Sequence, residues 1–308
     1  MKTRPDCAGS LVAPGMNLDQ LEHLTLQGAQ GIALHAAAIG RGPLMLFLHG
    51  FPECWCAWHR QLPLFGRMFR AVALDLRGYN LSDMPPNRAD YALPLIVDDV
   101  RRVIRALSPD RPAVIVGHDW GGIAGWVLAR ESPELIERMV IINAPHPAVF
   151  RRELKRSLRQ VLASSYAGFF QLRGVAEVVL RAFNFAALRA MVYRTSAKPD
   201  MFPAELRRAY LDTWRRPGWL TAGLNYYRNP SALTKEAAAS GQARIAVPTL
   251  VLWGDRDPAL RPSNLEGLGS FVAHLTLHRH PAATHWIVHE EPDWVNAAIG
   301  DFITTVQP

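Results

Sequence analysis

Residues 112–122 read PAVIVGHDWGG, and this stretch decides the fold. Its first half is an unbroken apolar run, as expected for a strand buried on both faces of a sheet. In its second half, Gly117, Gly121 and Gly122 let the backbone bend sharply from the strand into a helix. Such a turn holds the side chain of Asp119 in a strained, projecting position beside the free N–H groups of the helix N-terminus. We therefore predict a functional site at Asp119.

Strand-like and helix-like segments alternate on both sides of this stretch. The runs that predict further strands lie at residues 21–27, 32–39, 43–50, 70–78, 138–145, 247–257 and 273–279. The first two predict an antiparallel hairpin, and apolar residues at helical spacing predict helices over 94–107 and 292–303. This alternation predicts an α/β protein with a mostly parallel central sheet flanked by helices. Ligands of such sheets bind at the carboxyl ends of the strands, where Asp119 also lies.

Residues 146–236 differ from the rest of the chain. They contain no strand-like run, and arginines, aromatic residues and leucines recur there at helical spacing. We interpret this segment as an all-helical cap inserted into an α/β core made of residues 1–145 and 237–308. Residues 1–16, rich in Pro, Gly and small side chains, are expected to be a flexible leader.

The composition is that of a globular protein, with 49% hydrophobic and 20% charged residues among 308. No apolar run reaches the roughly 20 residues that a membrane-spanning helix needs, and the N-terminus shows no secretory signal. The cysteines, Cys7, Cys54 and Cys56, fit neither a disulfide framework nor a metal site. We therefore expect reduced thiols and a cytoplasmic location, with no metal or cofactor.

The formal net charge of +7 has its basic excess in the predicted cap, where residues 151–160 read RRELKRSLRQ and further arginines follow. A basic surface suits nucleic acid, an anionic membrane surface or an acidic substrate. No nucleic-acid-binding motif accompanies the charge, and the arginines alternate with apolar positions at helical spacing. We interpret them as the solvated face of amphipathic helices, and we expect no nucleic-acid partner.

Five motifs stand in order on the predicted strand ends: HGFPE (49–53), DLRGY (75–79), GHDWGG (117–122), GDRD (254–257) and THW (284–286). Together they resemble the α/β-hydrolase superfamily, and within it the soluble epoxide hydrolases. The resemblance covers nearly the whole chain from about residue 20. It implies the α/β-hydrolase fold, with Asp119 as the nucleophile. Asn80 departs from the small glycine usual in the family, and there we expect a local loop change without loss of chemistry.

An aspartate at the sharp turn selects the reaction. A serine there would attack a carbonyl carbon, whereas a carboxylate attacking an ester would form an anhydride, which is a poor intermediate. A carboxylate attacking a saturated carbon forms an ordinary alkyl ester that water can cleave. Asp119 therefore indicates an epoxide or an alkyl halide as the substrate and disfavours an esterase.

By resemblance, His285 is the base that activates water for the second step, and Asp257 is the carboxylate that orients its imidazole. His285 follows the last predicted strand, and the order nucleophile, acid, histidine along the chain is that of this fold. The alternatives nearby are Asp255 for the acid and His278, His280 and His289 for the base.

The tetrahedral oxyanion of ester hydrolysis needs two N–H donors. By resemblance these are the backbone N–H groups of Phe51 and Trp120, and the Phe51–Pro52 bond is a candidate cis peptide. His49 and Glu53, in the same loop as Phe51, are interpreted as scaffolding.

The leaving group separates an epoxide from a halide. An epoxide leaves as a basic alkoxide and needs a proton or a strong hydrogen bond, whereas a halide needs only N–H donors. Tyr166 in SYAGFFQ (165–171) and Tyr227 in LNYYRN (224–229) resemble the two ring-opening tyrosines of epoxide hydrolases. Tyr226 competes with Tyr227 for the second place. The predicted reaction is hydrolysis of an epoxide to a vicinal diol.

Apolar side chains predict a pocket for a small apolar epoxide, with water as the second reactant. The residues expected to line this pocket are Phe51, Trp120, Phe169, Phe170 and Met191. Two other functions stay open. A haloalkane dehalogenase, in which a tryptophan after the nucleophile binds halide, would use the same Asp119, and a non-catalytic protein would use the pocket for binding alone. A homodimer is a possible assembly.

Overall fold

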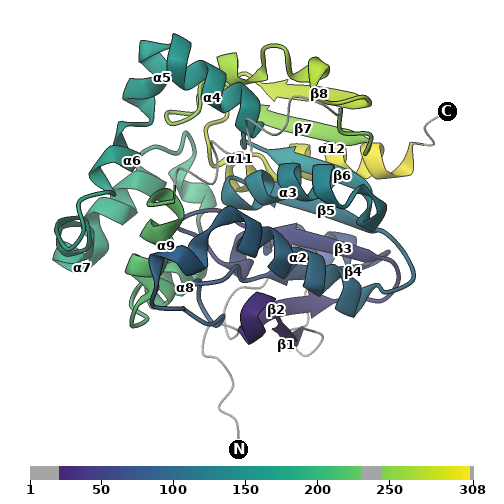
Figure 1. Cartoon of the computed structure of the whole chain (residues 1–308), viewed down its shortest axis with the longest axis horizontal. Coiled ribbons are helices and arrows are strands. Elements are labelled where there is room, and N and C mark those ends of the chain that lie inside the picture. Colours follow the sequence, from purple (N-terminus) through teal and green to yellow (C-terminus); the bar gives the residue numbers. More distant parts are fainter. Residues whose placement is uncertain (1–20, 230–243, 306–308) are drawn as a thin grey trace, which may run out of the picture.

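The computed structural model describes residues 21–229 and 244–305. Within these residues an eight-stranded sheet has the order β1-β2-β4-β3-β5-β6-β7-β8 (Figure 1). Its strands are Glu22–Gln27 (β1), Ala33–Ile39 (β2), Leu44–Leu48 (β3), Arg70–Leu74 (β4), Ala113–His118 (β5), Ile136–Ile142 (β6), Thr249–Gly254 (β7) and Leu275–His280 (β8). β1 pairs antiparallel with β2 and β2 antiparallel with β4, while all pairs from β4 to β8 are parallel. The mostly parallel sheet and the hairpin are therefore confirmed.

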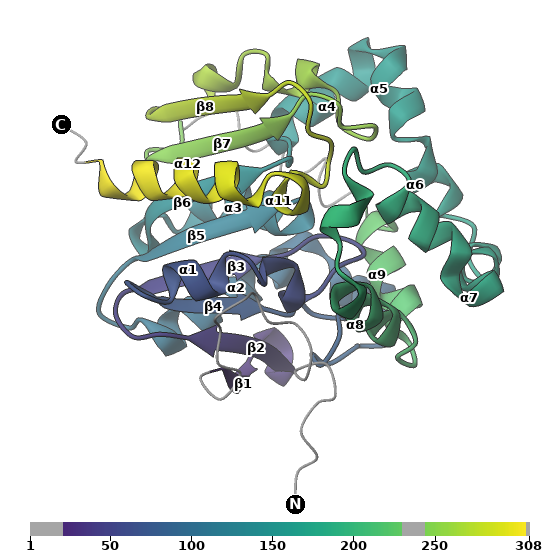
Figure 2. The same cartoon turned by 180° about the vertical axis from the view of Figure 1, so that it is seen from behind.

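Helices cover both faces of the sheet. α2 (Leu93–Leu107) and α3 (Trp120–Glu131) lie on the face seen in Figure 1. α1 (Leu62–Phe65), α11 (Ile287–Glu290) and α12 (Pro292–Thr304) lie on the face seen in Figure 2. Because both faces are covered, β3, β5 and β7 are buried along their whole length, which explains their unbroken apolar sequences.

A set of helices follows β6 and precedes β7, and we call them the inserted helices. They are Pro147–Arg156 (α4), Leu158–Ala163 (α5), Ser165–Phe169 (α6), Val175–Tyr193 (α7), Ala204–Trp214 (α8) and Trp219–Tyr227 (α9). They form the left-hand edge of the molecule in Figure 1, next to the ends of the parallel strands. The described residues from 146 to 229 contain no strand, as the sequence predicts. The predicted boundary between residues 236 and 237 lies outside the described residues.

The predicted helices at 94–107 and 292–303 correspond to α2 and α12. Four strands end at least two residues earlier than predicted, β3 at Leu48, β4 at Leu74, β6 at Ile142 and β7 at Gly254, because the residues after them turn to build the site. Asn80 takes a φ of 48°, a left-handed conformation that asparagine tolerates better than most residues. The side-chain amide of Asn80 donates to Asp75 at 2.7 Å. The residue that replaces the usual glycine therefore stabilises the turn through its side chain.

Cys54 and Cys56 are buried. Cys7 and the predicted leader, residues 1–16, lie outside the described residues. Among the helices of the described residues, none combines the length and the apolar character that crossing a bilayer requires.

Candidate active site

β5 ends at His118 and α3 begins at Trp120, so Asp119 alone makes the turn between them. Its φ of 47° and ψ of −119° lie in a region that residues with side chains rarely adopt. The close packing of the turn needs a glycine, because a Cβ at Gly121 would overlap the carbonyl group of Leu48. The turn is therefore as sharp as the sequence predicts, and it directs the Asp119 carboxylate against the loop that follows β3.

The loop after β3 binds the Asp119 carboxylate. Oδ2 of Asp119 accepts a hydrogen bond from the Phe51 N–H at 3.0 Å, and the Phe51–Pro52 peptide is cis, as predicted. Trp120, which carries the other predicted N–H donor, is the first residue of α3. Burial raises the pKa of Asp119, and the charge of His285 and the Phe51 N–H partly offset this rise. The carboxylate thus occupies a desolvated site with one backbone N–H already bound to it.

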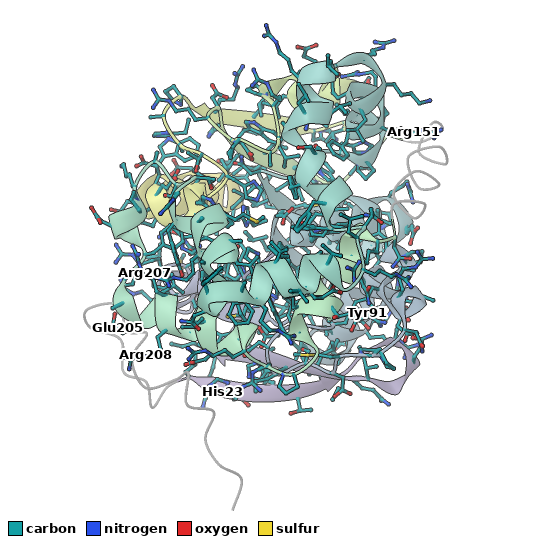
Figure 3. The ribbon with its side chains drawn as sticks, turned by 90° about the vertical axis from the view of Figure 1, so that its left-hand side faces the viewer. His23, Tyr91, Arg151, Glu205, Arg207 and Arg208 are labelled. Atoms are coloured by element: carbon teal, nitrogen blue, oxygen red, sulfur yellow. The ribbon has the colours of Figure 1, made fainter. Side chains whose placement is uncertain are left out.

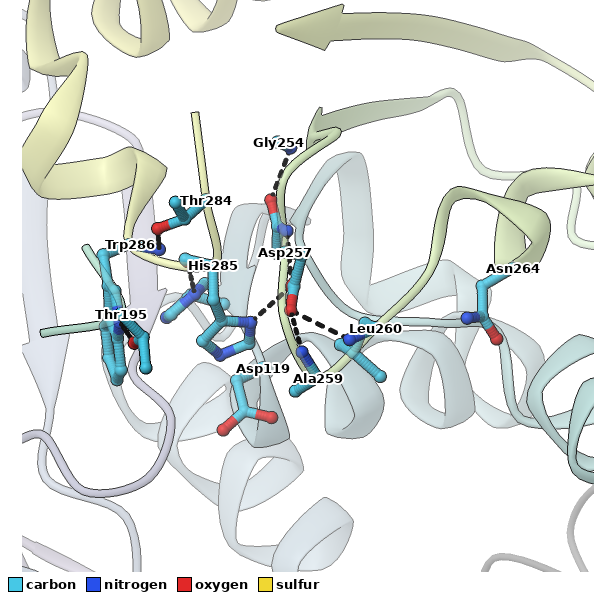
Figure 4. Close-up of polar contacts among 12 residues, drawn as sticks. Asp119, Thr195, Gly254, Asp257, Ala259, Leu260, Asn264, Thr284, His285 and Trp286 are labelled. Carbon is cyan, nitrogen blue, oxygen red and sulfur yellow. Dashed lines mark hydrogen bonds and ion pairs between the residues drawn. The ribbon is translucent and has the colours of Figure 1, made fainter. Parts of the chain in front are cut away.

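His285 and Asp257 are in direct contact. Nδ1 of His285 lies 2.7 Å from Oδ2 of Asp257 (Figure 4). The other oxygen of Asp257 accepts hydrogen bonds from the backbone N–H groups of Ala259 and Leu260, both at 2.8 Å. Because a carboxylate can only accept, Nδ1 of His285 carries a proton. The second ring nitrogen, Nε2, is left for chemistry in the cavity that His285 shares with Asp119.

Asn143, which the sequence analysis did not single out, completes the hydrogen bonding of Asp257. It follows β6 with a φ of 40°, and its Nδ2 donates to Oδ2 of Asp257 at 2.7 Å. Its Oδ1 accepts from the Gly254 N–H at 2.9 Å, at the end of β7. Asn143 therefore fixes both the carboxylate and the turn that carries it. The sequence did carry a signal for Asn143, because it directly follows the run that predicts β6 and so lies at the carboxyl end of a parallel strand.

Two carboxylates control the charge of His285. Burial alone would lower its pKa, but Asp257, through its charge and its hydrogen bond, and then Asp119 raise the pKa from 6.5 to about 9. The imidazolium of His285 is therefore favoured at neutral pH as long as Asp119 carries its negative charge. Converting Asp119 to a neutral ester would remove one of the two negative charges, so the pKa of His285 would fall.

The alternative acid and bases lie elsewhere. Asp255 pairs with Arg279 at 2.8 Å, and His278 is exposed. His280 accepts a hydrogen bond from a backbone N–H at 3.1 Å, and His289 lies against Glu53. Of the histidines considered, His285 is the one that bonds to Asp257 in the described part of the chain.

Glu53 is the centre of a buried network behind His285. Its carboxylate accepts a hydrogen bond from the Tyr210 hydroxyl at 2.7 Å and lies 2.7 Å from Nε2 of His289 and 3.1 Å from Nδ1 of His118. Nε2 of His118 in turn lies 2.9 Å from the carbonyl oxygen of His285. Burial raises the pKa of Glu53, but the hydrogen bonds from His118 and His289 outweigh it, and the pKa lies well below its usual value. The network joins the loops after β3 and β8 to α8, which agrees with the interpretation of Glu53 as scaffolding.

Tyr166 on α6 and Tyr227 at the end of α9 line the cavity that contains Asp119. Their ring centroids are 5.8 Å apart, with the rings 75° from parallel. Burial and the charge of Asp119 raise the pKa of both hydroxyls, so both stay protonated at neutral pH. The competing Tyr226 points elsewhere, because its hydroxyl donates to the Arg77 carbonyl at 2.8 Å. Of the two adjacent tyrosines, Tyr227 is the one at the cavity.

Two mostly apolar cavities, each of about 390 Å³, meet at Asp119, Tyr166 and Tyr227. The first is also lined by Phe51, Ala163, Ala187, Ala190, Met191, Thr195, Pro258, Ala259, His285 and Trp286. The second is also lined by Trp120 and runs out to Leu154 and Val161, two exposed residues of the inserted helices. Phe51, Trp120 and Met191 therefore lie where the sequence analysis expected them.

Phe169 and Phe170 line neither cavity, contrary to the expectation. Phe170 is fully buried, with its ring centroid 5.0 Å from that of Tyr227 and 5.6 Å from that of Phe51. Phe169 is half-buried and packs on Phe170 at 6.1 Å. Phe170 is four residues after Tyr166 and therefore lies on the same helical face, where Phe51 and Tyr227 already separate it from the cavities. These two phenylalanines pack behind the site.

Comparisons with known proteins agree with this architecture. A family model described as alpha/beta hydrolase fold matches residues 43–292. The chain is 38% identical over 276 residues to the AB hydrolase superfamily protein YfhM of Bacillus subtilis, covering 89% of this chain and 95% of the relative. It is 36% identical over 281 residues to epoxide hydrolase 4 of Homo sapiens, covering 89% of this chain and 76% of the relative. A solved structure of an epoxide hydrolase from Bacillus megaterium superposes with a TM-score of 0.85 at 34% identity, covering 92% of this chain and all of the other.

The chain therefore belongs to the α/β-hydrolase fold family. Within that family it belongs with the epoxide hydrolases, and it is an enzyme of the hydrolase class.

Proposed function

We propose that this enzyme adds water to small apolar epoxides to form vicinal diols, with Asp119 as a nucleophile that becomes a transient alkyl ester. One observation carries the proposal: a buried carboxylate shares its cavity with two tyrosine hydroxyls, those of Tyr166 and Tyr227. The carboxylate suits attack on saturated carbon, and the hydroxyls suit a basic leaving oxygen. The similarity to proteins named epoxide hydrolases supports the same substrate class.

In the first step, the epoxide oxygen accepts hydrogen bonds from Tyr166 and Tyr227. An oxygen of Asp119 attacks one epoxide carbon, the carbon–oxygen bond breaks, and the alkoxide takes a proton from a tyrosine. A phenol is ordinarily more acidic than an alcohol, so a tyrosine can supply this proton. The phenolate then regains a proton from the His285 imidazolium, which becomes neutral. The product of the step is a neutral ester between Asp119 and the opened substrate.

In the second step, His285 takes a proton from water, and the hydroxide attacks the ester carbonyl carbon of Asp119. Loss of the negative charge at Asp119 lowers the pKa of His285 at this stage, so the imidazole becomes a base only after the ester has formed. The oxyanion accepts hydrogen bonds from the Phe51 and Trp120 N–H groups. As it collapses, the leaving alkoxide takes the proton held by His285 and departs as the diol, and the Asp119 carboxyl then gives its proton to His285, which restores the starting charges. Replacing His285 with Gln should therefore let the ester accumulate as a protein adduct detectable by mass spectrometry.

The inserted helices act as the cap in this proposal, over residues 146–236, with residues 1–145 and 237–308 as the core. Two features support the division. The cap supplies Tyr166 and Tyr227, and the core supplies Asp119, Asp257 and His285. The substrate would thus bind between the two parts.

The test of the substrate class offers styrene oxide and 1-bromobutane side by side and measures diol against bromide release. The wild type should form diol and release little bromide. Replacing Tyr166 and Tyr227 together with Phe should slow diol formation by about 100-fold or more, the usual contribution of a general acid. Tyr226→Phe is the matched control, because its hydroxyl bonds outside the cavities, and it should keep its activity. Full activity in the double variant would rule out the tyrosines as proton donors.

A haloalkane dehalogenase is the second candidate, and one observation favours it. The indole Nε1 of Trp120 is buried and makes no well-formed hydrogen bond with the described residues; its polar neighbour there is the Tyr227 hydroxyl, so the indole N–H remains a donor that a halide could use. Bromide release faster than diol formation would support this candidate. Both candidates use Asp119 in the same way.

A further inference from the structure

The inserted helices carry most of the large apolar side chains that the described residues expose. Of eleven such side chains, nine lie between residues 154 and 183. They are Leu154, Leu158, Val161, Leu162, Leu172, Val175, Val178, Val179 and Phe183. Most basic residues of this segment are solvent-exposed, as the sequence predicts, but the apolar residues between them do not all turn inward. We call these nine side chains, which lie along the segment from α4 to α7 at one edge of the molecule, the apolar face (Figure 3 shows this side of the molecule).

The charge of the same segment is strongly positive. Residues 146–229 contain fifteen Arg and Lys against five Asp and Glu, a formal net charge of +10, while the rest of the chain carries −3. The acidic residues within 151–183 are already engaged: Glu153 is buried beside Arg152, and Glu177 binds Arg228 at 2.6 Å. Five exposed basic residues lie among these apolar residues and form no ion pair with the described residues. They are Lys155, Arg156, Arg159, Arg173 and Arg181. Their charge is therefore available to an anionic partner.

Phe183 is the most exposed of these apolar residues, with 90% of its surface accessible. It lies at a kink in α7, where Phe183, Asn184 and Phe185 take φ values of 51°, 56° and 60°. Three successive left-handed residues with side chains are costly, at about 1–2 kcal/mol each. The kink buries Phe185 and leaves Phe183 fully outside. Backbone strain that holds an aromatic ring in solvent indicates that the ring has a role at an interface.

The apolar face also borders the way to Asp119. The second cavity reaches from Asp119 and Trp120 to Leu154 and Val161, which belong to the face. A molecule that entered from this face would therefore pass along apolar walls to the carboxylate. Apolar compounds concentrate in lipid, so a lipid surface at this opening would supply the class of substrate that the cavity suits.

We propose that the apolar face and its five exposed basic residues dock the enzyme peripherally on an anionic lipid surface. The apolar side chains enter the boundary between headgroups and acyl chains, and the basic side chains bind the anionic headgroups. A second copy of the chain is a poorer occupant, because a two-fold contact would bring the same unpaired cations together. The charge complementarity favours lipid. The inference concerns binding alone, so it does not depend on the proposed reaction.

Vesicle flotation tests this proposal with the intact chain. Vesicles of phosphatidylcholine alone and of phosphatidylcholine with phosphatidylglycerol are mixed with the wild type at low and at high salt. We expect binding to the anionic vesicles that weakens as salt rises, and little binding to the neutral ones. Arg156→Gln with Arg159→Gln should weaken binding about 30-fold, at about 1 kcal/mol for each basic residue near an anionic surface. Phe183→Ser with Val178→Ser should weaken it as well.

Matched controls lie at the other end of the sheet. Arg105→Gln with Arg111→Gln removes the same charge from exposed positions near the start of β5, and Met68→Ser removes an exposed apolar residue near β4. Both controls should bind as the wild type does. The proposal is overturned if the wild type ignores anionic vesicles at low salt, or if the controls lose as much binding as the face variants. It is also overturned if the face variants convert a stable dimer into a monomer, because the face would then bind a second copy.

Discussion

Replacing Asp119 with Asn should lower the pKa of His285, because the amide keeps the shape of the carboxylate but not its charge. The raised pKa, from 6.5 to about 9, corresponds to about 3 kcal/mol of preference for the imidazolium in the folded enzyme. Asp257 makes the largest favourable contribution and Asp119 a smaller one, and both act against burial. Asp119→Asn should therefore remove part of this preference, and Asp257→Asn should remove more. Asp119→Asn also mimics the neutral charge of the ester.

The assay is a titration of the His285 ring nitrogens by NMR, with ¹⁵N-labelled histidine, over the range from pH 5 to pH 10. The wild type should titrate near pH 9, with the imidazolium present below that pH and lost above it. Asp119→Asn should titrate at a lower pH, and Asp257→Asn at the lowest. Asp255→Asn is the matched control, because Asp255 pairs with Arg279 instead, and it should titrate as the wild type does. Equal pKa values in the wild type and Asp119→Asn would refute the idea that ester formation turns His285 into a base.

Three further predictions follow from packing. Gly50→Ala should abolish turnover in a folded protein, because its Cβ would approach Oδ2 of Asp119 to 2.7 Å, and activity near that of the wild type would contradict this placement. Asn143→Leu should reduce kcat by about 10- to 100-fold, the value of a lost buried hydrogen bond, and an unchanged kcat would remove its positioning role. Asp99→Ala should cost about 3–5 kcal/mol of unfolding free energy, measured in urea, because it leaves the buried Arg77 unpaired, and a cost below about 1 kcal/mol would contradict that.

The fold was predictable because burial on both faces of a sheet leaves a direct mark on sequence. The continuous apolar runs at 43–50 and 112–119 became β3 and β5, and the helical spacing at 94–107 became α2. The strand ends were less predictable. Asp255, Arg256 and Asp257 are all charged, but charged residues occur both in the last positions of a strand and in the turn after it. The pairing of β7 with β6 and β8 decides where the strand ends.

The predictability of the site divides in a similar way. Asp119, Asp257 and His285 could be located because a motif names the position and the topology brings the strand ends together. The strand-end position of Asn143 was visible in the sequence, but its role and the partners of Glu53 were not, because they depend on hydrogen bonds between residues far apart in sequence, such as His118 with Glu53 at 3.1 Å. Phe170 was wrongly predicted to line the cavity. Helical spacing predicts the face on which a residue lies, but not that Phe51 and Tyr227 would lie between Phe170 and the cavity.

The inserted helices show the limit of the helical pattern itself. Apolar residues at helical spacing usually mark a buried face, and that rule holds for α2. In the segment from Leu158 to Phe183 it fails, because short helices and the kink in α7 offer more apolar surface than the core can cover. The positive charge and the apolar residues of this segment could be read from the sequence, but the solvent exposure of the apolar residues could not.

The most direct test of the proposed chemistry is a single turnover in ¹⁸O-water, with enzyme in excess over styrene oxide. If Asp119 forms an ester, its own oxygen leaves with the diol and the solvent oxygen replaces it in the side chain. Mass spectrometry of the peptide that contains Asp119 should then find the label there, and the diol should carry none. Label that is found in the diol and absent from Asp119 would show that water attacks the epoxide directly, and the covalent mechanism would be wrong.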